Sequence, residues 1–81
     1  MFYAYVLKSK KNGRLYYGST DDLKRRFKEH NSGIGGKYSS HNKPFELIYY
    51  EAYSTYVLAK KAEKFFKSGY GREVLKDKLE I

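Results

Sequence analysis

FYAYVLKSKKNGRLYYGS, residues 2–19, is the stretch that decides the fold. Residues 2–8 are aromatic and β-branched, a composition typical of a strand, and residues 15–19 predict a second strand. Asn12 and Gly13 lie between them, and both residue types tolerate the positive φ that a two-residue type I′ turn requires. We therefore predict that the chain opens with a β-hairpin.

The register of this hairpin decides which side chains share a face. A two-residue turn makes Lys11 face Arg14, and Tyr5 and Tyr16 then project to the same side because side chains alternate along a strand. They are offset by four residues, roughly 13 Å at ~3.3 Å per residue. Each tyrosine can be an ordinary sheet aromatic, but the two can also border one site across Gly18.

The rest of the chain predicts one more strand and several helices. The expected elements are a helix from a Ser19 or Thr20 cap to about Asn31, a mobile loop over 32–43, a strand over 45–51, a helix from Ser54 or Thr55 to about Phe66, and a short helix over 72–79. The predicted fold is α+β, a three-stranded antiparallel sheet flanked by helices in the order β-β-α-β-α-α.

Composition restricts the classes of function. The 81 residues predict a single domain over 1–81, and 17 Lys+Arg against 9 Asp+Glu give a net charge of +8, which favours a nucleic acid as partner. The absence of cysteine excludes a disulfide framework, a thiolate zinc site and a cysteine nucleophile, and it suits the cytoplasm. No apolar run approaches ~18 residues, so no membrane association is expected.

Helical geometry separates two adjacent arginines on the first helix. At 100° per residue, Arg26 lies beside the apolar stripe of Leu23 and Phe27, whereas Arg25 points to water. His30 lies on the same side as Arg26, one turn further along. Two alternatives stay open: His30 can be a charged histidine favoured by the helix dipole, and Arg26 can be a surface charge that steers phosphate.

The second long helix contains one acidic residue among several lysines. Glu63 lies at the margin of a stripe that we expect to be buried, formed by Leu58, Ala62, Phe65 and Phe66. Its carboxylate can pair with Lys67 or bind a metal ion. Because Mg²⁺ often takes only one or two protein carboxylates, one Glu with an Arg and a Tyr or His is compatible with phosphodiester hydrolysis.

Five segments together resemble the GIY-YIG nuclease family. Residues 3–5 (YAY) are a degenerate form of its first motif, residues 16–18 (YYG) of its second, and residues 19–31 look like its helix with an Arg and a His. Residues 59–63 and 67–72 resemble the compact single-domain bacterial branch, related to the nuclease domain of the bacterial repair excinuclease. The Gly and Ile of the first motif and the Ile of the second are replaced here.

The resemblance implies an endonuclease that hydrolyses DNA with Mg²⁺ or Mn²⁺. It implies that Tyr5 and Tyr16 border the scissile phosphate, that Arg26 and His30 are catalytic, and that Glu63 holds the metal. We expect cleavage to be selective for DNA structure rather than sequence, in repair or recombination, with specificity supplied by a protein partner. The residues expected to contact the nucleic-acid backbone are Lys37, Tyr38, Lys67 and Arg72.

Two other functions stay open at this point. The chain can be a DNA-binding module with the same fold and little nuclease activity, since a net charge of +8 suffices for salt-sensitive binding. It can also bind RNA, which we consider less favoured; this needs exposed aromatic rings on which unpaired bases stack, and the ten tyrosines allow it.

Overall fold

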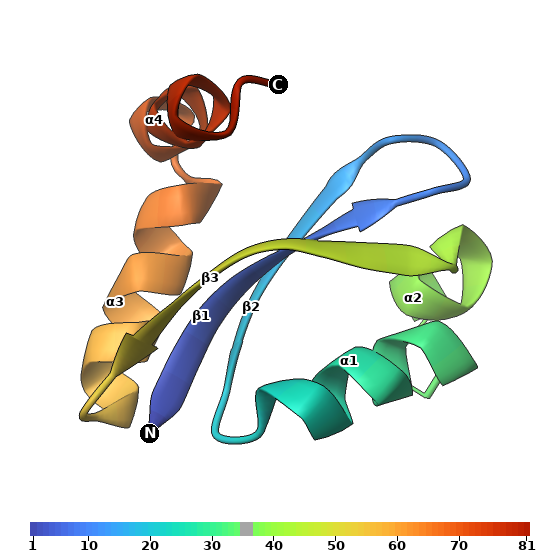
Figure 1. Ribbon diagram of the computed structural model, residues 1–81, viewed down its shortest axis with the longest axis horizontal. Helices are drawn as coiled ribbons and strands as arrows, with labels where there is room; N and C mark the ends of the chain where they lie inside the picture. The colour runs from blue at the N-terminus through green and yellow to red at the C-terminus, as the bar shows by residue number, and fades with distance from the viewer. Residues whose placement is uncertain (35–36) are drawn as a thin grey trace.

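The structure is a computed structural model that describes residues 1–34 and 37–81, without the side chains of 37–39. Its elements in chain order are β1 (Phe2–Ser9), β2 (Leu15–Thr20), α1 (Leu23–Ser32), α2 (Lys37–Asn42), β3 (Phe45–Tyr53), α3 (Tyr56–Lys67) and α4 (Gly69–Leu79) (Figure 1). The predicted fold class and element order are confirmed. One short helix, α2, lies within the segment for which the sequence predicts a loop.

The three strands form an antiparallel sheet in the order β2-β1-β3, with β1 in the centre. Tyr5 pairs with Gly18, and Leu7 pairs with Tyr16. The predicted register, in which Leu7 opposes Gly18, is therefore wrong by two residues. A shift of two preserves the alternation of side chains, so Tyr5 and Tyr16 still share a face and now lie roughly 7 Å apart along the strand.

The cause of the shift is a longer connection between β1 and β2. The Ser9 hydroxyl oxygen accepts hydrogen bonds from the backbone N–H groups of Lys11 (3.1 Å) and Asn12 (3.3 Å), and Asn12 Oδ1 accepts one from Arg14 N (2.9 Å). Gly13 has a φ of 77°, whereas Asn12 does not adopt a positive φ. A type I′ turn needs a positive φ at both positions, so polar side chains stabilise a wider loop instead.

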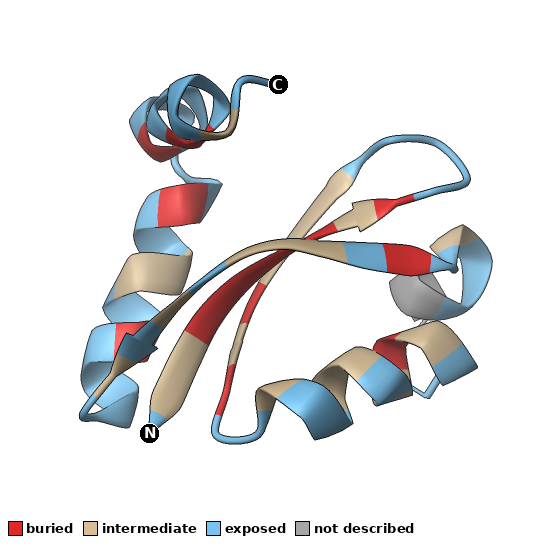
Figure 2. Cartoon of the chain, viewed as in Figure 1, coloured by how far each residue is buried: buried red, intermediate tan, exposed pale blue. Residues whose placement is uncertain are grey.

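The sheet is covered on both faces, and each face has its own apolar cluster. Under α3 and α4 the buried residues are Ala4, Val6, Phe66 and Leu75. Under α1 they are Tyr5, Leu7 and Phe45, against which Tyr16, Leu23 and Phe27 pack. Burial is concentrated in β1, as Figure 2 shows, because a central strand with a helix on either side loses water from both of its faces.

The helix boundaries follow local capping groups. Asp22 caps α1 by accepting a hydrogen bond from Arg25 N (3.0 Å), so the predicted cap at Ser19 or Thr20 is wrong, because β2 continues through both residues. Gly33 ends α1 with a φ of 86°, as predicted. Thr55 caps α3, also as predicted. No helix in the described ranges 1–34 and 37–81 combines the length and apolarity needed to cross a membrane.

The buried face of α3 differs from the predicted one. Ala59 and Phe66 are buried, whereas Leu58 is 43% exposed and Phe65 is 40% exposed. At 100° per residue, Ala59 lies about 100° from Leu58, so the helix turns its small residue toward the sheet. The rotation matters for the site because Glu63, one turn beyond Ala59, then faces β2.

Candidate active site

The first part of the site is a buried contact between a phenol of β1 and an imidazole of α1. The Tyr5 hydroxyl lies 3.0 Å from His30 Nε2, and both side chains are almost completely buried. Gly18 makes this position possible, since a Cβ there would overlap the Tyr5 ring and hydroxyl. The second-motif glycine therefore provides the space in which the phenol crosses β2.

Burial determines the protonation state of this pair. Burial, followed by the positive charge of Arg26, lowers the pKa of His30 to about 4, so the imidazole is neutral at pH 7. This lowered pKa does not fit the alternative of a charged histidine at the end of α1. Burial also raises the pKa of Tyr5 to about 12, against a hydrogen bond from Arg26 that favours the phenolate. Tyr5 is thus a neutral phenol at rest.

Tyr16 completes the aromatic part of the cluster. Its ring centroid lies 4.6 Å from that of His30, with the two planes inclined at 63°, and 6.4 Å from that of Phe45. The negative charge that Tyr16 would carry as a phenolate is among the influences that raise the pKa of Tyr5. The structure therefore brings Tyr5, Tyr16 and His30 together, as the sequence predicts.

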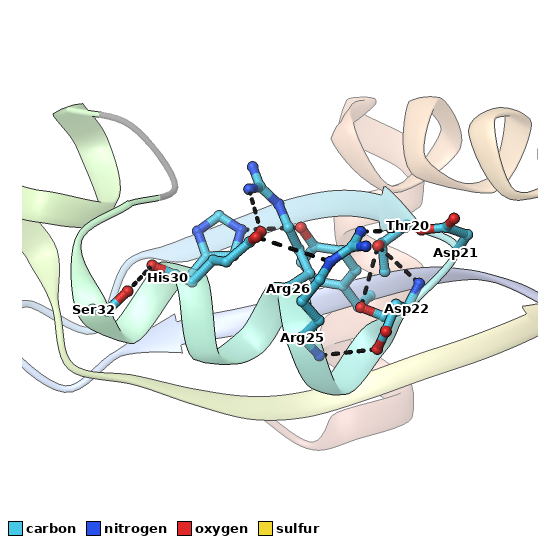
Figure 3. A network of polar contacts seen from close by, with 9 residues as sticks. Thr20, Asp21, Asp22, Arg25, Arg26, His30 and Ser32 are labelled. Atoms are coloured by element: carbon cyan, nitrogen blue, oxygen red, sulfur yellow. Dashed lines mark hydrogen bonds and ion pairs between the residues drawn. The ribbon is translucent and has the colours of Figure 1, made fainter.

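Arg26 reaches this cluster from α1, and Arg25 does not. The side chain of Arg26 is 30% exposed against 56% for Arg25, which agrees with the helical geometry. Arg26 Nη1 lies 3.0 Å from Glu29 Oε1. Figure 3 shows Arg26 together with Arg25 and His30 on α1. Burial alone lowers the pKa of Arg26, but the contacts with Glu29 and Tyr5 outweigh it and raise the pKa above its usual value.

Glu63 enters from α3 on the other face of the sheet. Its Oε1 accepts a hydrogen bond from the Ser19 hydroxyl (2.6 Å), and its Oε2 lies 2.6 Å from Lys67 Nζ; Lys60 Nζ is 3.5 Å from Oε1. Burial alone raises the pKa of Glu63, but Lys67 and Ser19 outweigh it and lower the pKa. The carboxylate is therefore anionic at pH 7, and its charge contributes to the raised pKa of Tyr5.

The oxygen atoms around Glu63 are compatible with one divalent cation of the hard type. The described part of the chain holds no group of three or more His, Asp or Glu side chains in metal-binding proximity. A single carboxylate with a neighbouring hydroxyl still suits Mg²⁺, which fills its remaining positions with water and phosphate oxygens. The ammonium groups of Lys67 and Lys60 already lie against the carboxylate, so a cation would have to displace them.

A hollow of about 470 Å³ lies between α1 and the start of α3, beside the end of β2. Ser19 and Arg26 line it, which places one residue bonded to Glu63 and one catalytic candidate along a single depression. Phe2 and Tyr56 contribute aromatic walls.

The predicted backbone contacts have internal partners or lie outside the described side chains. Lys67 pairs with Glu63, which is one of the two roles that the sequence left open for this carboxylate. The Arg72 guanidinium donates two hydrogen bonds to the Lys67 carbonyl (3.2 and 3.0 Å). The side chains of Lys37 and Tyr38 are not among the described ones. Their contacts with nucleic acid stay predictions.

Two residues of the site were not predicted from the sequence. Ser19 holds Glu63, and a signal existed, since Ser19 follows Gly18 on a strand and must point to the opposite face. Glu29 holds Arg26, and its spacing of three residues along a helix is one at which side chains meet.

Comparison with known proteins agrees with this geometry. Residues 1–76 match the model of the GIY-YIG catalytic domain. The chain is 48% identical to the UPF0213 protein YazA of Bacillus subtilis over 63 residues, or 78% of this chain and 63% of that protein. It is 46% identical to a UPF0213 protein of Bacillus pumilus over 66 residues, or 82% of this chain and 66% of that protein. The matched segment thus spans about two thirds of the length of each.

A solved structure is also similar. The solution NMR structure of a UPF0213 protein from Bacillus halodurans superimposes with a TM-score of 0.57, at 36% sequence identity, over 95% of this chain and 84% of that one. The family match covers far more than half of the sequence and includes both tyrosine motifs, the helix with Arg26 and His30, and Glu63. The chain therefore belongs to the GIY-YIG catalytic domain family, whose domains are in general endonucleases.

Proposed function

We propose that this protein is a divalent-metal-dependent endonuclease that hydrolyses DNA phosphodiester bonds, selects DNA structure rather than sequence, and acts in DNA repair or recombination in the cytoplasm. The observation that carries the proposal is the cluster around the Tyr5 hydroxyl. This hydroxyl contacts neutral His30, and its pKa is lowered by Arg26 and raised by Glu63. A basic group, an acidic group and a proton acceptor around one phenol suit the attack of water on phosphorus.

The proposed proton path uses the buried pair. A guanidinium can only donate, so the Tyr5 oxygen accepts from Arg26 while its own proton faces His30 Nε2. Tyr5 takes a proton from the attacking water as it passes its own proton to His30. Because the pKa of His30 is low, protonated His30 readily gives that proton up again. The P–O bond to the leaving oxygen breaks, and that oxygen gains a proton from solvent.

The other residues bind and neutralise the phosphate. Arg26 donates to the oxygens on which negative charge increases, and Tyr16 orients the phosphate or the water from beside His30. Glu63, held by Ser19, is the residue that would bind Mg²⁺ or Mn²⁺. When bound, the cation supplies Lewis-acid polarisation of the phosphate and a position for water. Lys67 and Lys60 must then move from the carboxylate.

The test is a panel of duplex, single-stranded and branched DNA incubated with Mg²⁺. The wild type is expected to cleave at least one of these, and Glu63→Gln and Arg26→Lys to lose about 100-fold or more in rate while binding DNA within about twofold of the wild type. Glu73→Gln, an exposed acid of α4, is the control and should cleave normally. Normal cleavage by Glu63→Gln would exclude the role given to that carboxylate.

One observation favours the second candidate, a DNA- or RNA-binding module with little activity. Both carboxylate oxygens of Glu63 already have partners within 2.6 Å, Ser19 on one and Lys67 on the other, so a metal ion has to compete for them. The same panel decides, because a module of this kind binds the substrates with strong salt dependence and cleaves none of them.

A further inference from the structure

Tyr56 is an aromatic residue in the hollow beside Arg26 that the proposed chemistry does not use. It is the first residue of α3 and is 45% exposed. Its ring lies 5.8 Å from that of Phe2, with the planes at 60°, and in Figure 1 the start of α3 lies beside the start of β1. Ser19 and Arg26 line the same hollow, so this ring is part of the wall next to the candidate catalytic arginine.

Helical geometry aligns Tyr56 with the proposed metal ligand. Glu63 is seven residues further along α3, which places it about 10.5 Å along the axis and only about 20° around it. Lys60 lies between them on the same stripe, with its ammonium 5.6 Å from the Tyr56 ring centroid. At roughly 3.4 Å per stacked nucleotide, this axial distance corresponds to about three nucleotides of one strand.

The charges of the hollow favour a flat, neutral group at this position. Arg26 pairs with Glu29 at 3.0 Å and Arg25 with Asp21 at 3.2 Å, so both guanidinium groups already have internal counter-ions. A second phosphate would have to displace one of these carboxylates, whereas a base has to displace only the Lys60 ammonium that lies over the Tyr56 ring. Tyrosine rings bind bases by stacking, and a nearby lysine can contact the adjoining phosphate.

A paired base cannot reach such a ring, because both of its faces are covered by its neighbours in the duplex. An unpaired, mismatched or single-stranded base leaves the stack at a much lower free-energy cost, and a site of this type therefore selects for it. We propose that Tyr56 is a stacking site for one unpaired nucleobase, about three nucleotides from the phosphate at Glu63. This inference rests on the proposed function for its nucleic-acid ligand, and it names the structural feature that the substrate must have.

The test measures binding in EDTA, so that cleavage plays no part. The probes are DNA strands containing the fluorescent base 2-aminopurine, used single-stranded, as a fully paired duplex, and as a duplex in which that base is the only unpaired one. The wild type should bind the two unpaired probes at least about tenfold more tightly than the duplex and quench their fluorescence. Tyr56→Ala should weaken that binding about 5- to 100-fold, with duplex binding changed less than about twofold.

Two variants serve as controls. Tyr56→Phe keeps the ring and should bind all three probes as the wild type does. Tyr70→Ala removes a tyrosine of α4 that is 74% exposed and lines neither this hollow nor the cluster around Tyr5, and it should have no effect. An RNA strand of the same sequence shows whether the site distinguishes the sugar.

The proposal is overturned if the wild type binds all three probes equally or none of them. It is also overturned if Tyr56→Ala weakens binding of the duplex as much as that of the unpaired probes, since the ring would then not distinguish unpaired from paired bases. Cleavage of the same DNA in Mg²⁺ is measured separately. Selective binding of the unpaired probes without any cleavage would refute the proposed nuclease function but support the stacking site. Cleavage without selective binding would support the nuclease function and refute the stacking site.

Discussion

Protonation of His30 should make the stability of this protein strongly dependent on pH in the mildly acidic range. The imidazole is fully buried and neutral, with a pKa lowered from 6.5 to about 4. In the unfolded chain it regains a pKa near 6.5. The unfolded state therefore binds more protons than the folded one between about pH 6.5 and pH 4, and the folded state loses stability as the pH falls through this window.

The size of the effect follows from the two pKa values. Between pH 7 and pH 5 the difference in proton binding removes about 2 kcal/mol from the free energy of unfolding. For a domain of this size that is a large share of the total. Glu51 and Glu63 also have lowered pKa values, but carboxylates lose their contribution further down, as the pH falls below about 4.5 and through their folded pKa values. Above pH 5, the loss of unfolding free energy with falling pH is therefore due mainly to His30.

Urea unfolding followed by circular dichroism at pH 7, 6, 5.5 and 5 measures this loss. His30→Asn is the comparison: it will be less stable at pH 7, but its free energy of unfolding should vary much less over the same range. An equal slope in both proteins would refute the reasoning, and so would an NMR titration in which His30 of the folded protein protonates near pH 6.5.

Two further predictions concern the space over β2 and the proposed cation site at Glu63. Gly18→Ala should cost about 1–3 kcal/mol in the free energy of unfolding, because a Cβ there overlaps the buried Tyr5 ring, whereas Gly69→Ala, with no atom within 4 Å, should cost nothing in the same urea titration. Lys67→Met removes the ammonium group that lies 2.6 Å from Glu63, so this variant should bind Mn²⁺ several-fold more tightly than the wild type by calorimetry. The control is Lys64→Met, on the exposed side of α3, which should bind Mn²⁺ as the wild type does. Equal Mn²⁺ affinities of the two variants would show that Lys67 does not compete for the site.

Much of the fold could be predicted because its signals are local. The strand composition of residues 2–8 and 15–19, the stop at Gly33 and the cap at Thr55 each depend on a few neighbouring residues, and the structure confirms them. The predicted turn was wrong because Ser9 and Asn12 stabilise a wider loop through side-chain hydrogen bonds that a residue-pair preference does not describe.

The candidate site could be predicted to a different extent for each residue. Tyr5 and Tyr16 were placed on one face correctly even with the wrong register, because the face depends only on whether the shift is odd or even. Arg26 was distinguished from its neighbour by the helical period alone. The contact between Glu63 and Ser19 could not be derived that way, because it depends on how far α3 is rotated against the sheet, which packing around Ala59 determines.

Gly18 and Ser19 are consecutive residues of β2 that face opposite sides of the sheet. The phenol of Tyr5 lies against Gly18, and the carboxylate of Glu63 accepts a hydrogen bond from Ser19. Since β2 is an outer strand of the described sheet, the two halves of the site meet around a rim rather than inside an enclosed chamber. A polymer can therefore approach from the side without threading through the protein. The opposite edge of the sheet is β3. A further module attached along β3 would leave that approach to the candidate site open.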